Sequence, residues 1–82
     1  MLSRQHSSAM EHASLVPHWW VNDLRGDGRA VRVSAHVEAG FLVVSTWKSD
    51  ECVGTVRLLP SEAAELVAGL AEGLARLAPA PK

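Results

Sequence analysis

Apolar and polar residues alternate over residues 30–59, and from Ser61 onward the apolar residues recur at helical spacing. Alternation with a period of two predicts strands that bury one face, whereas recurrence at i, i+3 and i+4 predicts an amphipathic helix. Turn-forming residues interrupt the alternation at Ala39-Gly40 and at residues 49–51. The pattern predicts an α+β domain of ββββα order: a four-stranded antiparallel meander sheet with one C-terminal helix packed on one face.

The predicted turns set the register of the sheet. The first strand, residues 18–24, is followed by Asp27-Gly28, a dipeptide that suits a two-residue type I′ turn. The other strands are expected over residues 31–38, 41–48 and 52–59. A two-residue turn at Ala39-Gly40 pairs Val37 with Leu42, and a three-residue turn at residues 49–51 pairs Leu42 with Leu58. These pairs share one face, the predicted core.

The helix is expected to cover that core face. Ser61 is the predicted N-cap, since its hydroxyl can accept a hydrogen bond from a free amide of the first turn. One apolar stripe contains Ala63, Leu66, Val67, Leu70, Leu74 and Leu77. Gly69 and Gly73 border this stripe at GxxxG spacing, which favours close packing on a strand or, alternatively, on a second helix.

The opposite sheet face mixes polar residues with large apolar ones, which a fully solvated face does not usually contain. The preferred interpretation is a homodimer interface made by Phe41, Val43, Trp47 and Val53. The alternative is a single-stranded nucleic-acid surface, on which Trp47 stacks bases while Arg32 and Arg57 hold phosphates. A different protein partner is the third interpretation. Of the adjacent Trp19 and Trp20, one is expected on each face.

Length and composition favour the dimer. With 82 residues the chain forms one domain, predicted over residues 14–77, with a flexible arm at 1–13 and a flexible tail at 78–82. So small a domain buries little core by itself and is often supplemented by a disulfide, a metal or a partner subunit. Cys52 is the only cysteine, which excludes an internal disulfide, so a second copy is the expected supplement.

Candidate chemistry adds little to this picture. The four histidines lack the spacing and the carboxylate neighbours typical of a metal site, and no nucleophile elbow or phosphate-binding loop is present. We therefore expect no catalytic residue, no cofactor and no metal, and predict that the protein is not an enzyme. The N-terminus lacks the apolar core of a signal peptide, and Phe41 to Val44 is far too short for a membrane span. With a lone thiol, these features predict a soluble cytoplasmic protein that does not bind membranes.

The run WKSDECVGTVRLLPSEAAELVAGLAEGLA resembles small actinobacterial proteins of ββββα type, a resemblance that covers residues 30–77 and implies no function. Four antiparallel strands followed by a helix are also similar to the arrangement of the transcriptional coactivator PC4 family, whose dimers bind single-stranded DNA on their sheets. The chain lacks an obvious lysine-rich surface, and its formal net charge is −1. The expected function is a non-catalytic homodimeric binding module with a regulatory role, which binds through the sheet face, and PC4-like nucleic-acid binding is the alternative.

Overall fold

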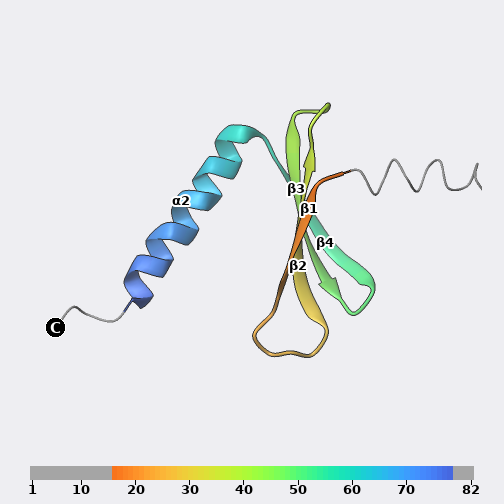
Figure 1. The fold of residues 1–82 in the computed structure, drawn as a ribbon, viewed down its shortest axis with the longest axis vertical. Coiled ribbons are helices and arrows are strands. Elements are labelled where there is room, and N and C mark those ends of the chain that lie inside the picture. Colours follow the sequence, from red (N-terminus) through yellow and green to blue (C-terminus); the bar gives the residue numbers. More distant parts are fainter. Residues whose placement is uncertain (1–15, 79–82) are drawn as a thin grey trace, which may run out of the picture.

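The computed structural model describes residues 16–78, so the predicted arm and nearly all of the predicted tail lie outside the described residues. Four strands are followed by one helix: β1 (His18–Asn22), β2 (Arg29–His36), β3 (Phe41–Lys48), β4 (Glu51–Leu58) and α2 (Pro60–Leu77). The strands form one antiparallel sheet in the order β1-β2-β3-β4 (Figure 1). The predicted α+β ββββα meander is confirmed.

Strand pairing divides the side chains of the sheet between two faces, because paired residues point to the same side. What we call the apolar face carries Trp19, Val21, Val31, Val33, Ala35, Leu42, Val44, Val56 and Leu58. What we call the tryptophan face carries His18, Trp20, Arg32, Ser34, His36, Phe41, Val43, Ser45, Trp47, Thr55 and Arg57. The division between faces in β2 and β3 follows the sequence alternation, and Trp19 and Trp20 lie on opposite faces as predicted.

The loop between β1 and β2 differs from the predicted two-residue turn. It comprises residues 23–28, and its ends are joined by a hydrogen bond from the Asp23 amide to the Arg29 carbonyl oxygen, 3.0 Å long. The Asp23 carboxylate also accepts the backbone N–H of Arg25 at 2.8 Å, which closes the chain several residues before Asp27-Gly28. The predicted type I′ turn is therefore wrong, and the first strand ends at Asn22.

The β2–β3 loop is longer than predicted. Residues 37–40 form it, and Gly40, at a φ of 81°, donates its amide to the His36 carbonyl oxygen at 2.8 Å. Ala35, rather than Val37, consequently lies opposite Leu42. The predicted register is wrong by two residues, and because two is the period of a strand, every side chain keeps its predicted face.

The β3–β4 connection is a two-residue turn at Ser49-Asp50, with Lys48 paired to Glu51. A bulge between Thr46 and Trp47 then gives β4 one extra residue. Beyond the bulge, Leu42 pairs with Leu58 as predicted. The predicted three-residue turn is wrong, whereas the register that it was meant to produce is confirmed.

The helix begins two residues earlier than a Ser61 cap requires. Leu59 is the N-cap and Pro60 the first helical residue, where proline is favoured because it needs no amide partner. The Glu62 carboxylate accepts the Leu59 amide hydrogen at 2.9 Å, which satisfies the polar group at the start of the helix. The predicted Ser61 cap is wrong because this glutamate does the capping.

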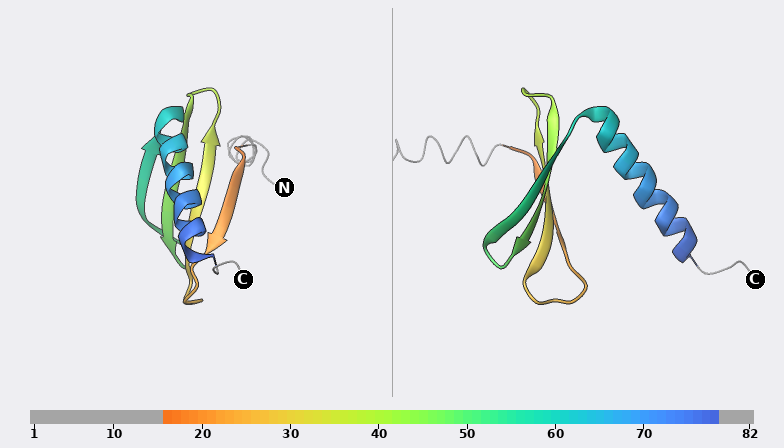
Figure 2. Two further views of the ribbon diagram at one scale, coloured as in Figure 1. Left: turned by 90° about the vertical axis from the view of Figure 1, so that its left-hand side faces the viewer. Right: turned by 180° about the vertical axis from the view of Figure 1, so that it is seen from behind.

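The helix leaves the sheet instead of packing flat on it. Figures 1 and 2 show α2 running back along the sheet and diverging from it toward the helix C-terminus. Pro60 lines a hollow together with Ala35 and Leu42, so the helix starts on the side of the apolar face. Ala63 is the one residue of α2 that is half-buried, and the others are exposed. The expected packing of the helix on the face is not made within the single chain.

As a result, the described chain lacks an ordinary hydrophobic core. Within residues 16–78 no hydrophobic side chain is fully buried, and the buried residues are Ser34 and Ser45. The leucine stripe of α2 is exposed along its whole length, from 43% at Leu66 to 81% at Leu77. Hydrophobic burial normally supplies most of the free energy of folding, and within residues 16–78 the apolar face and the leucine stripe realise little of it.

The β1–β2 loop and the β3–β4 turn are joined at Gly28, and this contact leads to a testable prediction. Gly28 has a φ of 89°, its carbonyl oxygen accepts the Ser49 amide at 2.6 Å, and an added Cβ would lie 3.0 Å from the Ser49 hydroxyl oxygen. Gly28→Ala should lower the free energy of unfolding by about 2 kcal/mol. Gly26 also has a positive φ, but an added Cβ there would meet no atom within 4 Å. Gly26→Ala should therefore lower the free energy of unfolding by only about 1 kcal/mol. Equal losses in chemical denaturation would contradict the loop contact.

Candidate functional site

The apolar face is open to solvent over much of its area. Trp19, Val21 and Val56 are 58%, 63% and 56% exposed, although they lie in the rows of the sheet expected to form the core. Several large apolar side chains exposed together mark an interaction surface, whereas single ones are common on any protein. This face and the exposed stripe of α2 lie on the same side of the sheet.

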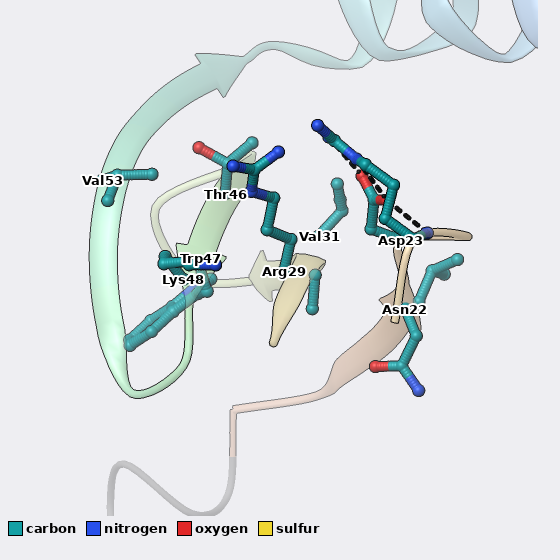
Figure 3. Close-up of a pocket in the computed structure, with 11 residues that line it drawn as sticks. Asn22, Asp23, Arg29, Val31, Thr46, Trp47, Lys48 and Val53 are labelled. Atoms are coloured by element: carbon teal, nitrogen blue, oxygen red, sulfur yellow. Dashed lines mark hydrogen bonds and ion pairs between the residues drawn. The ribbon is translucent and has the colours of Figure 1, made fainter. Parts of the chain in front are cut away.

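A hollow of about 450 Å³ lies at the end of the apolar face near the β1–β2 loop. Val21, Val31, Thr46 and Val53 are among its apolar and uncharged lining residues (Figure 3). The charged lining residues are Asp23, Arg25, Arg29 and Lys48. In Figure 3, Val31 and Thr46 point toward the side where α2 lies, while Trp47 points the other way. The hollow thus has an apolar floor and a mainly basic rim.

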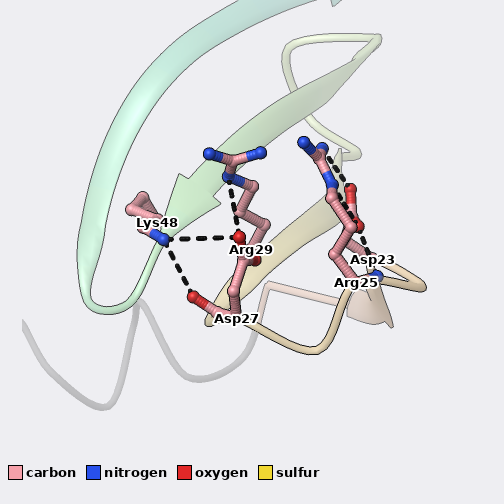
Figure 4. Close-up of polar contacts among 5 residues, drawn as sticks. All are labelled: Asp23, Arg25, Asp27, Arg29 and Lys48. Carbon is pink, nitrogen blue, oxygen red and sulfur yellow. Dashed lines mark hydrogen bonds and ion pairs between the residues drawn. The ribbon is translucent and has the colours of Figure 1, made fainter.

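Ion pairs fix the rim of this hollow (Figure 4). The Arg25 guanidinium donates to both oxygens of the Asp23 carboxylate, at 2.9 and 2.8 Å. Asp27 lies 3.5 Å from the Arg29 Nε and 3.6 Å from the Lys48 Nζ, and that ammonium also donates to the Asp27 carbonyl oxygen at 2.9 Å. Three cations against two carboxylates leave the rim with a net positive charge.

These contacts shift the acidity of both aspartates. The side-chain hydrogen bonds from Arg25 hold the pKa of Asp23 well below its ordinary value, and the Arg25 backbone amide acts in the same direction. Desolvation pushes the pKa of Asp27 upward, but the charges of Arg29 and Lys48 outweigh it and leave that pKa lowered. Both carboxylates are therefore ionised at neutral pH, and each tightens its loop.

The tryptophan face is organised around Arg32. Its guanidinium lies 4.8 Å from the ring centre of Trp47 and 5.4 Å from that of Trp20, both within the range of cation–π attraction. The two indoles meet edge to face at 5.4 Å. The Trp47 indole donates to the Ser45 hydroxyl at 2.9 Å, and that hydroxyl donates to the Arg32 carbonyl oxygen at 3.3 Å. Arg32, Trp20 and Trp47 thus find part of their packing and hydrogen-bond partners within the chain.

The predicted interface residues do not form one exposed patch. Phe41 stacks on His36 at 5.3 Å, and Val43 and Trp47 are half-buried. Val53 lies at the bulge and lines the hollow of the apolar face, so it does not lie with Trp47 on the predicted interface face. Their role as an interface stays a prediction, and more apolar surface is exposed on the other face and on α2.

The predicted nucleic-acid residues do share the tryptophan face. Arg57 is paired with Val43 on this face and is exposed. Arg32, by contrast, lies between two indoles, and its Nε is buried without a hydrogen-bond partner in the described part of the chain. Arg32 therefore acts first as a packing group, which leaves Arg57 the freer of the two cations for a phosphate.

Neither the basic rim nor the free position of α2 was predicted from the sequence. Arg25 lies in the β1–β2 loop, Arg29 is the first residue of β2 and Lys48 is the last residue of β3. Only the pairing of β2 with β3 brings these positions to one end of the sheet. The signal for the free helix is the connection itself, because only Leu59 separates the last strand residue from Pro60. A connection of one residue restricts how a helix can turn back onto a sheet.

The described residues give no sign of two other kinds of site. Over residues 16–78 no three or more His, Cys, Asp or Glu side chains gather in a way that would hold a metal ion. The helix in that range, α2, is not long and apolar enough to cross a membrane.

Comparison of the chain with family models, curated proteins and solved structures gave no match. The resemblances to actinobacterial proteins and to the PC4 family therefore remain predictions.

The Asp23–Arg25 pair predicts a pH dependence of stability. Because the pKa of Asp23 is lower in the folded chain than in the unfolded one, the pair stabilises the fold above about pH 4 and loses this effect as the pH falls further. Asp23→Asn should lower the free energy of unfolding near neutral pH, and the difference from wild type should shrink in acid. Asp50→Asn is the control, since Asp50 forms no ion pair in the described part of the chain. A difference that persists unchanged in acid would refute the assignment.

Proposed function

We propose that this protein is a non-catalytic binding module that works as a homodimer, joined through the apolar face and the stripe of α2. The observation that supports this proposal is that both surfaces are exposed in one chain while no hydrophobic side chain of residues 16–78 is fully buried. A second copy brings the same pair of surfaces, so each helix can cover the sheet of the other subunit. The interface is then self-complementary, as two-fold symmetry requires.

The dimensions of the two surfaces support a second copy as the occupant. Eighteen helical residues span about 27 Å, and strands of eight residues span about 26 Å. Burial of the four exposed leucines and Val67 would contribute roughly 7–15 kcal/mol gross for each helix, before the entropy of ordering. That gain is comparable with the whole stability of a small domain, so folding and association are expected to be linked.

This proposal moves the dimer interface from the face predicted by the sequence to the opposite one. The tryptophan face then stays open for a ligand or a regulatory partner, which agrees with a module whose function is binding. The free thiol of Cys52 is exposed, and an exposed unpaired cysteine fits a reducing, cytoplasmic location. These assignments of location and regulation belong to the proposal.

Two substitutions separate the two interfaces. Leu70→Glu places a charge in the α2 stripe, where Leu70 is 61% exposed in the single chain, so it should convert a dimer to monomer and lower the melting temperature. Val43→Asp places a charge on the tryptophan face and should leave the dimer intact. Sedimentation measures the mass, and circular dichroism shows whether each variant folds. A dimer that survives Leu70→Glu but is lost in a folded Val43→Asp would restore the interface predicted from the sequence.

Single-stranded nucleic-acid binding is the second candidate function, in the manner of the PC4 family. It is favoured by one observation: Trp20, Trp47 and Arg57 share a face, and Trp20 is 49% exposed. An exposed indole offers a stacking surface worth about 1–3 kcal/mol per base, and a nearby arginine can contact phosphate. The dimer proposed above leaves this face accessible.

Oligonucleotide titration tests the second candidate. If the tryptophan face binds single strands, tryptophan fluorescence should be quenched, and the affinity should fall as salt rises because phosphate contacts release counterions. Arg57→Ala should weaken such binding, while Glu38→Ala in the β2–β3 loop should not. We expect only non-specific affinity, about 10⁻⁴ to 10⁻⁶ M at physiological salt. Binding tighter than about 10⁻⁶ M that Arg57→Ala weakens would favour nucleic acid as the ligand.

A further inference from the structure

We infer that the two helices of the dimer pack antiparallel, each lying in the gap between the helix and the sheet of the other subunit. A Glu65–Arg76 ion pair between subunits would lie on either side of a contact made by Gly69 and Gly73. This inference rests on the proposed homodimer and assigns its geometry. It comes from the order of residues along one edge of α2, from the open space at the glycines and from the charge at the end of the sheet.

One edge of α2 carries four residues in a distinctive order. Glu65, Gly69, Gly73 and Arg76 are separated by four, four and three positions, the spacing that places side chains on one side of a helix. The leucine stripe borders this edge, so a helix that contacts a sheet through its leucines presents the edge to a neighbour lying alongside. The edge reads acidic, small, small and basic from the beginning of the helix to its end.

The glycines on this edge are not used inside the chain. A Cβ added to Gly69 or Gly73 would meet no atom within 4 Å. Glycine is unfavourable within a helix, so two of them on one edge point to a neighbour that needs close approach of the backbone. The predicted close packing of this GxxxG pair on a strand of the same sheet is wrong, since the helix stands away from that sheet.

Charge selects the direction of the two helices. Residue 71 is the midpoint of the glycine pair, with Glu65 six positions before it and Arg76 five positions after it. In an antiparallel pair centred there, each Glu65 lies beside the Arg76 of the other subunit. In a parallel pair, each of these residues would lie beside its own copy, and like charges would repel. Arg76 also contacts Glu72 of its own helix at 3.4 Å, which holds the guanidinium on the charged side of α2.

The basic rim of the apolar face favours the same direction. The C-terminal end of α2 lies level with the β1–β2 loop (Figure 2), so an antiparallel partner helix would bring its N-terminal half to that end. That half carries Glu62 and Glu65, and the rim has a net positive charge from Arg25, Arg29 and Lys48. An acidic helix segment over a basic rim is complementary, and a parallel partner would place the Arg76 end there instead.

A charge exchange in the full-length dimer tests this geometry. E65R alone and R76E alone should each raise the dissociation constant about 3- to 30-fold at low ionic strength, because two symmetry-related pairs are lost. The double variant E65R/R76E should lower the dissociation constant at least about threefold below that of either single variant, since the pairs re-form with reversed signs. The recovery is incomplete, because the positive charge at position 65 then lies over the basic rim. A parallel pair would show no such rescue, because each position would still face its own copy.

Two controls keep the test decisive. E38R makes the same charge change in the β2–β3 loop and should leave the dissociation constant within about twofold of wild type, which screens out effects of net charge. Gly69→Leu has room inside the single chain and should keep the helical signal in circular dichroism, yet it should raise the dissociation constant at least tenfold. A stable dimer with no rescue by the double variant would overturn the antiparallel geometry alone. A monomeric wild-type chain would overturn the proposed function as well.

Discussion

A single extended residue, Leu59, joins β4 to α2, and Pro60 after it sets the direction of the first helical turn. With so short a connection, the helix starts beside Leu42 and Ala35 and then moves away from the sheet. The Glu62 carboxylate strengthens this start by accepting the Leu59 amide. This geometry explains the exposed apolar surfaces, because a helix that diverges from its own sheet leaves the apolar face and the leucine stripe uncovered by the rest of residues 16–78.

The two faces of the sheet differ in how far other side chains of the chain cover them. On the tryptophan face, Arg32 fills the space between Trp20 and Trp47, and the indole of Trp47 has its hydrogen-bond partner in Ser45. Among residues 16–78 the apolar face has no comparable covering groups, since valine and leucine side chains offer one another only packing. In the proposed dimer, a partner subunit would therefore stabilise the apolar face more than the tryptophan face, although the residue composition of the tryptophan face first suggested the opposite.

In the proposed dimer, the charged groups set the relative direction of the two helices, whereas the affinity comes from other surfaces. The carboxylates of Asp23 and Asp27 form ion pairs with Arg25 in the β1–β2 loop and with Arg29 and Lys48 at the adjacent strand ends, and this places a positive rim at one end of the apolar face. Exposed ion pairs contribute little free energy, so the apolar surfaces must supply the affinity. Charge contributes direction, because like charges brought together disfavour one of two otherwise similar packings.

The sequence by itself determined the order of elements, the face of each residue in β2 and β3 and the register of Leu42 with Leu58, because strand and helix periodicities are local properties of the chain. The face of Val53 in β4 was decided by the bulge. It also placed Trp19 and Trp20 on opposite faces. Loop lengths were decided by contacts across the fold, such as the Ser49 amide with the Gly28 carbonyl oxygen, which no local pattern encodes. The position of α2 was likewise decided by the tertiary structure. An amphipathic stripe favours burial of one face of the helix, but it does not specify which surface will cover that face.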